Sequence, residues 1–330
     1  MNLKNKKVLI TGAGGFIGSH LVEELVNHKC KVRALVHYNS QNRYGNLETL
    51  PKTIKDKIEI ISGDVTDILN AKKAVEGCEV VFHLAALISI PYSYYSPFSY
   101  VHTNILGTLN IMQACLENKT MKVIHTSTSE AYGTAIYTPI DEDHPLQGQS
   151  PYSASKIGAD KIVESYCRSF GLPVATIRPF NTFGPRQSAR AIIPTIITQI
   201  LSGKKSIRLG SINTVRDFNY VKDTVNGFIK IAESEKSVGQ VINIGSGTGI
   251  SIKNLVKIIN SIMGSKVLIS FDKNRIRPEK SEVMKLICDN RKAAKLAGWK
   301  PEYDLTAGLK RTIEFVRDNP DLYKSDLYNI

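Results

Sequence analysis

The chain has 330 residues, of which 42% are hydrophobic and 22% charged, and this composition is typical of a globular protein with one large domain or two unequal ones. Lysine and arginine outnumber aspartate and glutamate by 43 to 30, which gives a net charge of +13. No run of five like charges occurs, so the sequence predicts no nucleic-acid partner. The basic balance fits either an anionic small substrate or an ordinary solvated surface.

The cysteines and the apolar runs predict a cytoplasmic protein that does not enter a membrane. The five cysteines are widely spaced, form no C-x-x-C pair and lie mostly among apolar neighbours, as is typical of reduced, buried thiols. The longest apolar run, residues 80–90, is too short to span a membrane. No side chains have the spacing of metal ligands, so we expect no metal site.

A glycine-rich turn follows the first predicted strand at the N-terminus. Gly12, Gly15 and Gly18 have the spacing G-x-x-G-x-x-G, and Phe16 and Ile17 begin a helix. A strand, a glycine turn and a helix in this order are typical of a dinucleotide site, because the turn is tight, the backbone can approach a pyrophosphate and the helix can pack on the strand. A purely structural turn is the alternative. The position directly after the first strand favours cofactor binding.

The second predicted strand, residues 31–37, bears on the choice of cofactor. An acidic residue at its end would bind the ribose 2′-hydroxyl of NAD, but this strand ends at His37 without one. Arg33 and Arg43 lie nearby and could meet the 2′-phosphate of NADP. The sequence therefore predicts NAD(P) with NADP slightly favoured, and His37 and Arg43 in the site. The alternative places Arg43 on a solvated loop.

The ends of the third and fourth predicted strands, residues 57–61 and 79–84, supply further cofactor candidates. Asp64 follows the third strand, where its carboxylate could accept a hydrogen bond from an adenine amino group or, alternatively, cap the next helix. Small residues follow the fourth strand and would let a cofactor lie close. The candidates from these two strands are Asp64, Val65, Leu84, Ala85 and Ala86.

A long helix after the fifth predicted strand carries the main catalytic pair. Ser150 suits the N-cap and Pro151 the first helical position, and Tyr152 and Lys156 then project from one face because they are four residues apart. A lysine ammonium beside a phenol favours the phenolate, and the helix N-terminus adds partial positive charge. Tyr152 is therefore expected to accept a proton at neutral pH.

Polar residues at the end of the fifth strand, residues 122–127, are expected to face this helix. Thr128 offers a hydrogen bond and Glu130 a carboxylate, so a base, a donor and an acid would converge on one small molecule. A tyrosine and a lysine four apart are a weak pattern alone, but the glycine turn makes the combination specific. His83 and His125, near strand ends, are expected to be buried and satisfied rather than catalytic.

Strands that alternate with helices predict an α/β fold with a Rossmann-type, doubly wound parallel sheet. The alternation fades after residue 180. We predict a dinucleotide-binding domain at residues 1–180, to which about 213–244 return, and a smaller mixed α/β substrate-binding cap at residues 181–212 and 245–330. The remaining expected strands are 7–11, 173–178 and 240–244, and the main expected helices are 100–117, 152–170 and 305–317.

The predicted cap contains three arginines that stand out as possible diphosphate ligands. Arginine binds phosphate oxygens in a bidentate manner, and Arg186, Arg216 and Arg277 lie near turns or strand ends. Each of them alone is more often an ordinary surface charge.

Taken together, these segments resemble the extended short-chain dehydrogenase/reductases that act on nucleotide sugars. The matching segments cover nearly the whole chain in the family's order: Thr11–Gly18, Asp64–Val65, Leu84–Ala86, Tyr152 with Lys156, Arg178–Arg186 and Arg216–Phe218. The resemblance implies a nucleotide-diphosphate sugar as the substrate. The substrate-binding residues that it implies are Asn104, Asn181, Arg186, Arg190, Arg216 and Arg277.

Within that family, Thr128, Ser129 and Glu130 resemble the catalytic segment of the 4,6-dehydratases, whereas the 4-epimerases usually lack the acid. Residues 145–152 and 184–190 look like the N-acetylglucosamine-nucleotide 4,6-dehydratases of the bacterial legionaminic-acid pathway, which use a GDP- or UDP-linked sugar. The resemblance implies that Tyr152 and Lys156 oxidise C4, that Glu130 removes the C5 proton, and that water leaves from C6. Ser129 stands where some dehydratases have an aspartic acid, so the source of the leaving-group proton stays open.

Two other functions remain open at this point. A nucleotide-sugar 4-epimerase or 4-reductase would need Tyr152, Lys156 and Thr128 but not Glu130. A non-catalytic dinucleotide-binding sensor on the same fold would not need the tyrosine and lysine pair. The resemblance also implies a homodimer, formed through the predicted helices 100–117 and 152–170.

Overall fold

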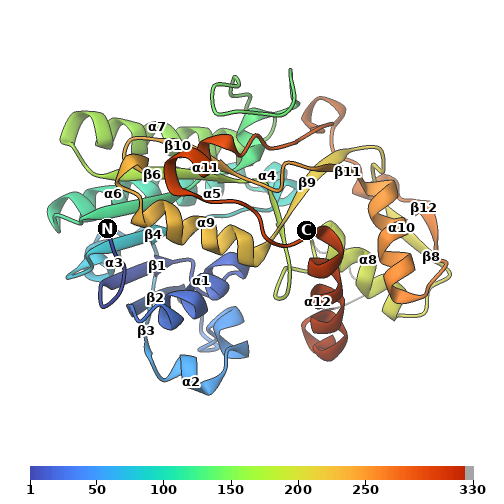
Figure 1. The fold of residues 1–330 in the computed structure, drawn as a ribbon, viewed down its shortest axis with the longest axis horizontal. Coiled ribbons are helices and arrows are strands. Elements are labelled where there is room, and N and C mark those ends of the chain that lie inside the picture. The colour runs from blue at the N-terminus through green and yellow to red at the C-terminus, as the bar shows by residue number, and fades with distance from the viewer. Residues whose placement is uncertain (324–330) are drawn as a thin grey trace.

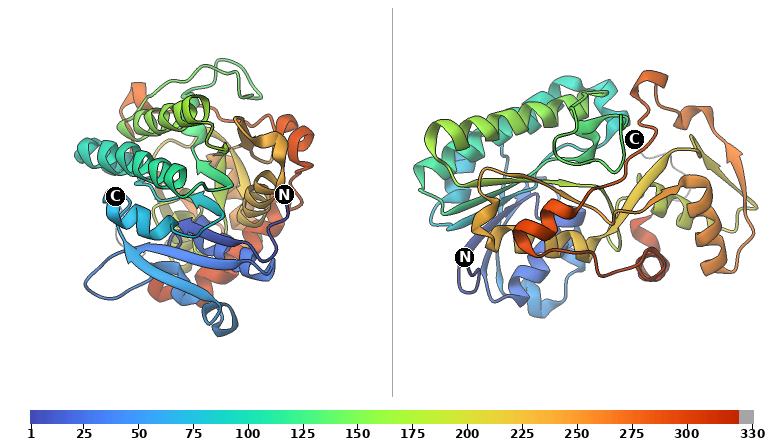
Figure 2. Two further views of the ribbon diagram at one scale, coloured as in Figure 1. Left: turned by 90° about the vertical axis from the view of Figure 1, so that its left-hand side faces the viewer. Right: turned by 45° about the horizontal axis from the view of Figure 1, so that its top comes forward.

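A seven-stranded sheet between two layers of helices dominates the computed structural model, which describes residues 1–323 (Figures 1 and 2). The fold is α/β as predicted. The strand order is β10-β6-β5-β4-β1-β2-β3, and each neighbouring pair is parallel. The strands are β1 (Lys7–Thr11), β2 (Lys31–His37), β3 (Ile58–Gly63), β4 (Val80–His83), β5 (Lys122–Thr126), β6 (Val174–Pro179) and β10 (Val241–Ile244).

Side chains of each central strand alternate between the two helical layers. In β1, Val8 and Ile10 belong to one hydrophobic core and Leu9 to the other. Both faces of the sheet are therefore covered, which is why its strands are almost continuously apolar. One layer consists of α1 (Phe16–Asn27) and α9 (Val221–Glu233), and the other of α3 (Ile68–Val75), α6 (Gly107–Glu117) and α7 (Pro151–Phe170).

The chain reverses its direction of winding between β1 and β4, which are neighbours in the sheet. Ligands of open α/β sheets bind at such a switch point, outside the carboxyl ends of the strands. The glycine turn after β1 lies there against the segment after β4, because a Cβ on Gly12 would come within 2.8 Å of the Ala85 nitrogen. Gly12 also has φ +68°, which favours glycine.

A second group of elements forms the opposite end of the molecule in Figure 1. It contains a three-stranded sheet of order β11-β9-β7 and a parallel pair, β12 and β8. The bounds are β7 (Asn181–Phe183), β8 (Ser206–Leu209), β9 (Val215–Tyr220), β11 (Gly249–Ser251), β12 (Leu268–Phe271), α8 (Ile192–Leu201), α10 (Ile252–Met263) and α12 (Leu305–Asp318). These strands are short, and most of them were not expected from the sequence.

The chain passes between the two groups of elements more than once. β9 belongs to the small sheet, whereas β10 joins the large sheet beside β6. The division into residues 1–180 with 213–244, and a cap at 181–212 and 245–330, stays a proposal. The last seven residues of the predicted cap, 324–330, lie outside the described residues.

The predicted helix 100–117 is not one regular helix. α5 (Pro97–Tyr100) is followed by a π-helical turn, Val101–Leu106, and only then by α6. The hydroxyl of Thr108 donates to the Asn104 carbonyl oxygen at 2.6 Å, and a side chain that enters the helical hydrogen-bond ladder in this way is a common cause of such distortions. The remaining short helices are α2 (Lys52–Lys55), α4 (Ile90–Tyr95) and α11 (Arg291–Ala297).

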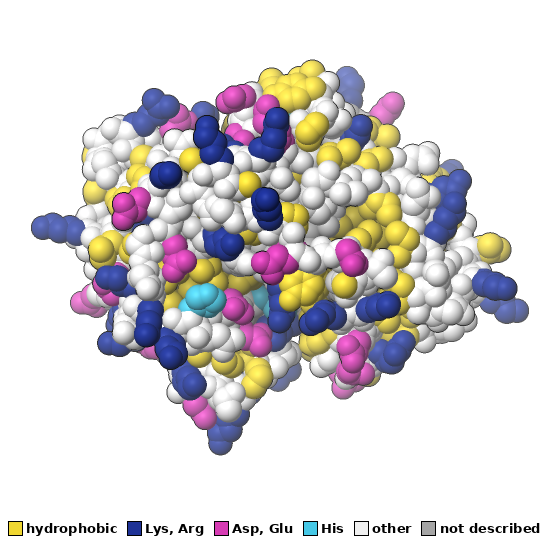
Figure 3. Space-filling view, in the orientation of Figure 1, with side chains coloured by type: hydrophobic (Ala, Val, Ile, Leu, Met, Phe, Trp, Pro, Cys, Tyr) yellow, Lys and Arg dark blue, Asp and Glu magenta, His cyan; other side chains and the backbone are white. Residues whose placement is uncertain are grey.

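The surface carries its basic charge in a dispersed form. Lys and Arg side chains are scattered over the face shown in Figure 3, between acidic and apolar groups. Within residues 1–323, every helix is too short or too polar to pass through a bilayer.

Gly18 provides a test of the packing that positions the glycine turn. A Cβ at Gly18 would lie 2.2 Å from the Gly12 carbonyl oxygen, whereas a Cβ at Gly15 would lie 3.1 Å from the same atom. Overpacking typically costs about 1–3 kcal/mol, so Gly18→Ala should lower the free energy of unfolding in urea by about 2 kcal/mol, although alanine is the better helix former. Gly15→Ala is the matched control and should change it by less than about 1 kcal/mol. Equal stability of the two variants would contradict this packing.

Candidate active site

The polar segment after β5 is held at the carboxyl edge of the sheet. Residues Ser129–Tyr132 form a short 3-10 helix, and the Thr128 hydroxyl caps it by accepting a hydrogen bond from the Glu130 N–H at 3.2 Å. Ser129 is buried, and the Glu130 side chain is 12% exposed. Glu130 is therefore an acid that faces a partly closed site rather than bulk solvent.

Helix α7 begins where the sequence predicted. The Ser150 hydroxyl accepts from the Ser153 N–H at 3.1 Å, and the Ser153 hydroxyl accepts from the Ser150 N–H at 2.9 Å, which completes a capping box. Pro151 occupies the first turn. This cap fixes the start of the helix and so places Tyr152 in its first turn and Lys156 one turn later.

Tyr152 is enclosed next to Thr128. Its ring packs edge-on against Tyr100, with centroids 6.2 Å apart, and the side chain is buried. Burial raises the pKa of Tyr152, while a hydrogen bond with Thr128 lowers it and the charge of Glu130 raises it further. The expectation of a phenolate at neutral pH is therefore not met in the chain alone, because burial outweighs the effect that we expected from Lys156.

Lys156 is a buried cation. Within residues 1–323 its ammonium group makes no hydrogen bond or ion pair, although only 3% of the residue is exposed. Burial lowers the pKa of Lys156 to about 8, and the charge of Asp160 opposes this shift. Lys156 follows Tyr152 by four residues on α7, so both side chains project from one face of the helix.

His83 is buried and satisfied, as predicted, whereas His125 is buried but its Nδ1 atom has no hydrogen-bond partner in the described structure. The two rings of His83 and His125 stack at 5.8 Å. His83 lies between the hydroxyls of Thr11 and Thr108, at 2.8 and 3.1 Å, and burial lowers its pKa. His125 contacts the Asp160 carboxylate at 3.1 Å.

Sequence reasoning missed Asp160. This carboxylate is buried and also accepts hydrogen bonds from Ser127 at 2.7 Å and from Arg178 at 2.8 Å. The available signal was its position four residues after Lys156, which places both side chains on one face of α7.

The residues at the switch point fit a dinucleotide. The N-terminus of α1 has no side-chain cap, so its first N–H groups are free to face a phosphate. The N–H groups of Leu84 and Ala85 both donate to the Thr11 hydroxyl at 3.1 Å, which holds the small segment Leu84–Ala86 beside the glycine turn. Phe16 and Ile17 begin α1 at this point.

The end of β3 orders a second part of the same region. The Asp64 carboxylate accepts from the Thr66 N–H at 2.9 Å and lies 3.4 Å from His37, the last residue of β2. The alternative that Asp64 caps the next helix is wrong, because Asp67 is the N-cap of α3. Val65 is buried against Gly107 of α6, and an adenine-binding role for Asp64 stays a prediction.

The two arginines proposed for a 2′-phosphate differ in their surroundings. Arg33 is buried and donates to the carbonyl oxygens of Ala74 and Glu76 at 2.9 and 2.8 Å, and it pairs with Glu59 at 3.0 Å. The suggestion that Arg33 meets a 2′-phosphate is therefore wrong, since its hydrogen bonds hold the end of α3. Arg43 is 70% exposed and lies 3.5 Å from Glu48.

Two arginines of the second group of elements converge on Glu282, and one of them also approaches Glu130. Arg277 lies 4.0 Å from Glu130 and 3.8 Å from Glu282, and Arg216 lies 3.5 Å from Glu282. The Nη1 atom of Arg277 is buried without a hydrogen-bond partner in the described structure. A buried guanidinium nitrogen without a partner, such as that of Arg277, is suited to bind an anion such as a diphosphate.

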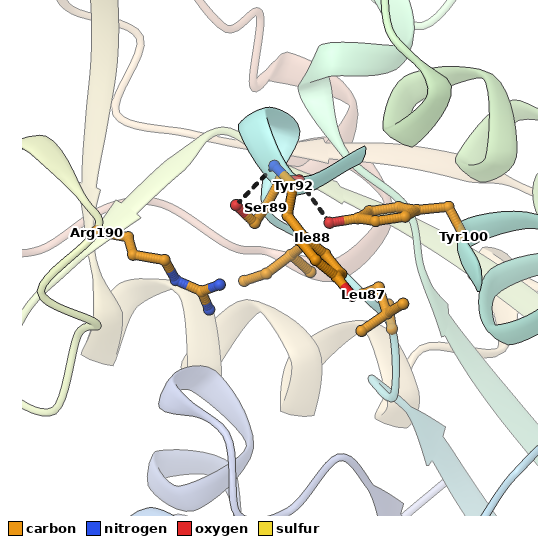
Figure 4. A pocket seen from close by; sticks show the side chains of 7 residues that line it. Leu87, Ile88, Ser89, Tyr92, Tyr100 and Arg190 are labelled. Atoms are coloured by element: carbon orange, nitrogen blue, oxygen red, sulfur yellow. Dashed lines mark hydrogen bonds between the residues drawn. The ribbon is translucent and has the colours of Figure 1, made fainter. Parts of the chain in front are cut away.

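A cavity of about 280 Å³ is lined in part by Tyr100. Figure 4 shows Arg190 entering it from one side and Tyr100 from the other, with Ile88 and Leu87 between them. Asn181 begins β7, and its buried side-chain oxygen has no hydrogen-bond partner in the described structure. Arg190 and Asn181 both remain predicted substrate ligands.

Two of the predicted substrate ligands have other partners. The Asn104 side chain binds both backbone groups of Leu87, at 2.9 and 3.0 Å, and donates to Ser155 at 2.9 Å, so it holds the loop after β4. Arg186 pairs with Glu23 of α1 at 2.8 Å and thereby joins the second group of elements to the glycine-turn helix. The side chain of Asn104 is therefore used within the fold. The Nε and Nη1 atoms of Arg186 are buried without a hydrogen-bond partner in the described structure, so substrate binding by Arg186 stays a prediction.

Comparisons with known proteins agree with this geometry. The model of the family GDP-mannose 4,6 dehydratase matches residues 9–312. A putative UDP-glucose 4-epimerase of Methanocaldococcus jannaschii is 33% identical over 94% of this chain and 99% of its own length. The human dTDP-D-glucose 4,6-dehydratase is 31% identical over 95% of this chain and 91% of its own length.

A solved structure extends the agreement to the fold and the cofactor. The dTDP-glucose 4,6-dehydratase DesIV of Streptomyces venezuelae, with NAD and TYD bound, is 27% identical and covers 96% of this chain and 99% of its own, with a TM-score of 0.87. The match confirms the Rossmann-type sheet, and the NAD bound to this relative supports a dependence on NAD(P). The chain therefore belongs to the GDP-mannose 4,6-dehydratase family, which comprises NAD-dependent nucleotide-sugar 4,6-dehydratases and related 4-epimerases.

Proposed function

We propose that this protein is a nucleotide-sugar 4,6-dehydratase that converts GDP- or UDP-N-acetylglucosamine to its 4-keto-6-deoxy product. The observation that carries the proposal is the Glu130 carboxylate, which lies in the site beside Thr128 and Tyr152. A 4-epimerase needs only to oxidise and reduce C4, whereas a dehydratase needs a base for the C5 proton as well. The sugar and the bases rest on the resemblance of residues 145–152 and 184–190.

In the first step, Tyr152 takes the proton from the C4 hydroxyl while Thr128 orients the same oxygen. Burial keeps Tyr152 neutral when no ligand is bound, so Tyr152 must first release its own proton to solvent. The positive charge of Lys156, one turn along the same helix, favours this loss. The glycine turn at Gly12 and Gly15 and the segment Leu84–Ala86 would hold NAD(P), which would supply the acceptor for the C4 hydride and the donor for C6.

In the second step, the new C4 ketone acidifies the C5 proton and Glu130 removes it. The C6 hydroxyl leaves with a proton as water, so Glu130 can pass on the proton that it took from C5 and become ionised again. Ser129 is buried and a hydroxyl is a weak acid, so we assign the leaving-group proton to Glu130. C5 is then protonated again from solvent as C6 receives the hydride.

Arg216 and Arg277 are the proposed ligands of the substrate diphosphate. In the described structure both lie close to Glu282, and Arg277 also approaches Glu130. A diphosphate offers them stronger acceptors than these partly satisfied contacts. Arg277 would then lie between the diphosphate and the base.

We also propose a cytoplasmic homodimer. The segment that includes α4, α5 and the π-helical turn carries exposed apolar side chains next to α7, among them Tyr95, Phe98 and Val101, which are 75%, 77% and 51% exposed. Association through α6 and α7 would bury part of this surface.

Glu130→Gln tests the dehydratase proposal directly. The variant should still reduce the bound cofactor with the sugar nucleotide, because Tyr152, Lys156 and Thr128 are intact. Loss of water should slow by about a hundredfold or more, since a positioned base contributes that much. Single-turnover absorbance of the reduced nicotinamide and mass spectrometry of the sugar separate the two steps.

Glu282→Gln is the matched control, since Glu282 also lies near Arg277 but has no proposed contact with C5. This control should still release water. Full dehydration by Glu130→Gln would refute Glu130 as the base, and a product of unchanged mass from the unmodified protein would favour the 4-epimerase.

Arg43→Ala tests the predicted preference for NADP. Arg43 is the remaining arginine that could pair with a 2′-phosphate, because Arg33 is buried and bonded elsewhere. Its removal should weaken NADP binding by about tenfold, or about 1.4 kcal/mol, and leave NAD binding unchanged, as measured by calorimetry. An unmodified protein that already binds NAD more tightly than NADP would show that this preference is wrong.

A further inference from the structure

We propose that Asp160 is a positioning residue of this site, whose buried carboxylate fixes α7 on the sheet and supplies the counter-charge that keeps Lys156 protonated beside Tyr152. The inference relies on the proposed function only for the roles of Tyr152 and Lys156. It adds a third member to the known pair, one helical turn further along α7.

The position of Asp160 is set by contacts with two strands. Tyr152, Lys156 and Asp160 are successive residues of one stripe on α7, because each is four residues from the next. From the far end of this stripe, Asp160 accepts hydrogen bonds from Ser127 after β5 and from Arg178 of β6. These bonds anchor the helix in the region where the catalytic side chains must face Thr128 and Glu130.

Asp160 belongs to a cluster of buried charged side chains. Asp160 is flanked by two permanent or near-permanent cations, Lys156 and Arg178. Hydrogen bonds from His125 and the charge of Arg178 hold the pKa of Asp160 at about 2, although burial alone would raise it. Asp160 is therefore ionised at every working pH, and it leaves one net positive charge in the cluster.

The other titratable groups around Lys156 do not change this net charge near neutral pH. His83 of β4 and His125 of β5 are neutral, since burial lowers both pKa values. Tyr152 on α7 is neutral in the chain alone because burial raises its pKa. Glu130 lies beyond Tyr152 and close to Arg277. Asp160 is therefore the carboxylate on which the charge of Lys156 depends.

Removal of this carboxylate has a predictable sign. Without Asp160, Lys156 and Arg178 would be two buried cations without a counter-ion, and only the lysine can lose its proton. Neutral Lys156 no longer favours the phenolate of Tyr152. In both proteins the rate of hydride transfer should fall as the pH rises. Without Asp160 this fall should begin at a lower pH than in the unmodified protein.

The experiment compares Asp160→Asn with Ser127→Ala and Asp160→Glu. Single-turnover reduction of the bound cofactor is measured against pH. In the unmodified protein the rate should fall as pH rises through about 8. Asp160→Asn should move this alkaline limb down by about 1–3 pH units, as expected for the loss of a nearby opposite charge. Ser127→Ala removes one hydrogen bond to the same carboxylate but no charge, so its limb should stay in place. Asp160→Glu should reduce the cofactor more slowly, but the pH at which its rate falls should change little.

The proposal would be overturned if the rate of Asp160→Asn fell at the same pH as that of the unmodified protein. An equal shift in Ser127→Ala would also overturn it, because hydrogen-bond geometry rather than charge would then be the cause.

A second readout does not depend on turnover, so it separates this inference from the proposed function. Lys156→Met should stabilise the protein below pH 8, because the folded-state pKa of Lys156 lies below its unfolded value, and the gain should vanish as pH rises through the window from 8 to 10.5. In the Asp160→Asn background the gain from Lys156→Met should persist but begin to decline at a lower pH. If Asp160→Asn does not fold, the double variant should recover folding. Failure of the double variant to fold, or the same midpoint in both backgrounds, would contradict the role of Asp160.

Discussion

The hydrogen bonds that join α7 to β5 and β6 are the constraint on which the site depends. Through Asp160, one helix is tied to Arg178 and to the segment that begins with Ser127, and this segment continues directly into Thr128 and Glu130. The phenol on the helix and the polar groups after the strand therefore keep a fixed relation. A loop alone would not hold two reacting groups to the tolerance that hydride and proton transfer require.

A single carboxylate separates two reactions on this scaffold. Under the proposed function, oxidation of C4 is common to epimerases and dehydratases, and Tyr152, Lys156 and Thr128 would suffice for it. Elimination adds one demand, a base that reaches C5 and is ionised when the ketone forms. Under the proposed function Glu130 meets this demand, because it is mostly enclosed and its carboxylate lies within the site, close to Arg277.

The sequence predicted the features that depend on neighbouring residues. The cap at Ser150 and Pro151, the glycine turn at Gly12 and the parallel sheet are local patterns, and all are confirmed. It could not predict partners that meet only after folding. Arg33 looked free for a phosphate but is used at the end of α3. Asn104 and Arg186 likewise have partners on other elements. The π-helical turn was missed because Thr108 competes for a backbone carbonyl, which no periodicity reveals.

The mass of the product formed in heavy water tests the central claim most directly. The unmodified protein, NAD(P) and GDP- or UDP-N-acetylglucosamine should yield a 4-keto sugar nucleotide that has lost one water and carries one deuterium at C5, because C5 gives up its proton and is protonated again from solvent. A product that keeps the mass of the substrate, without deuterium at C5, would contradict the account.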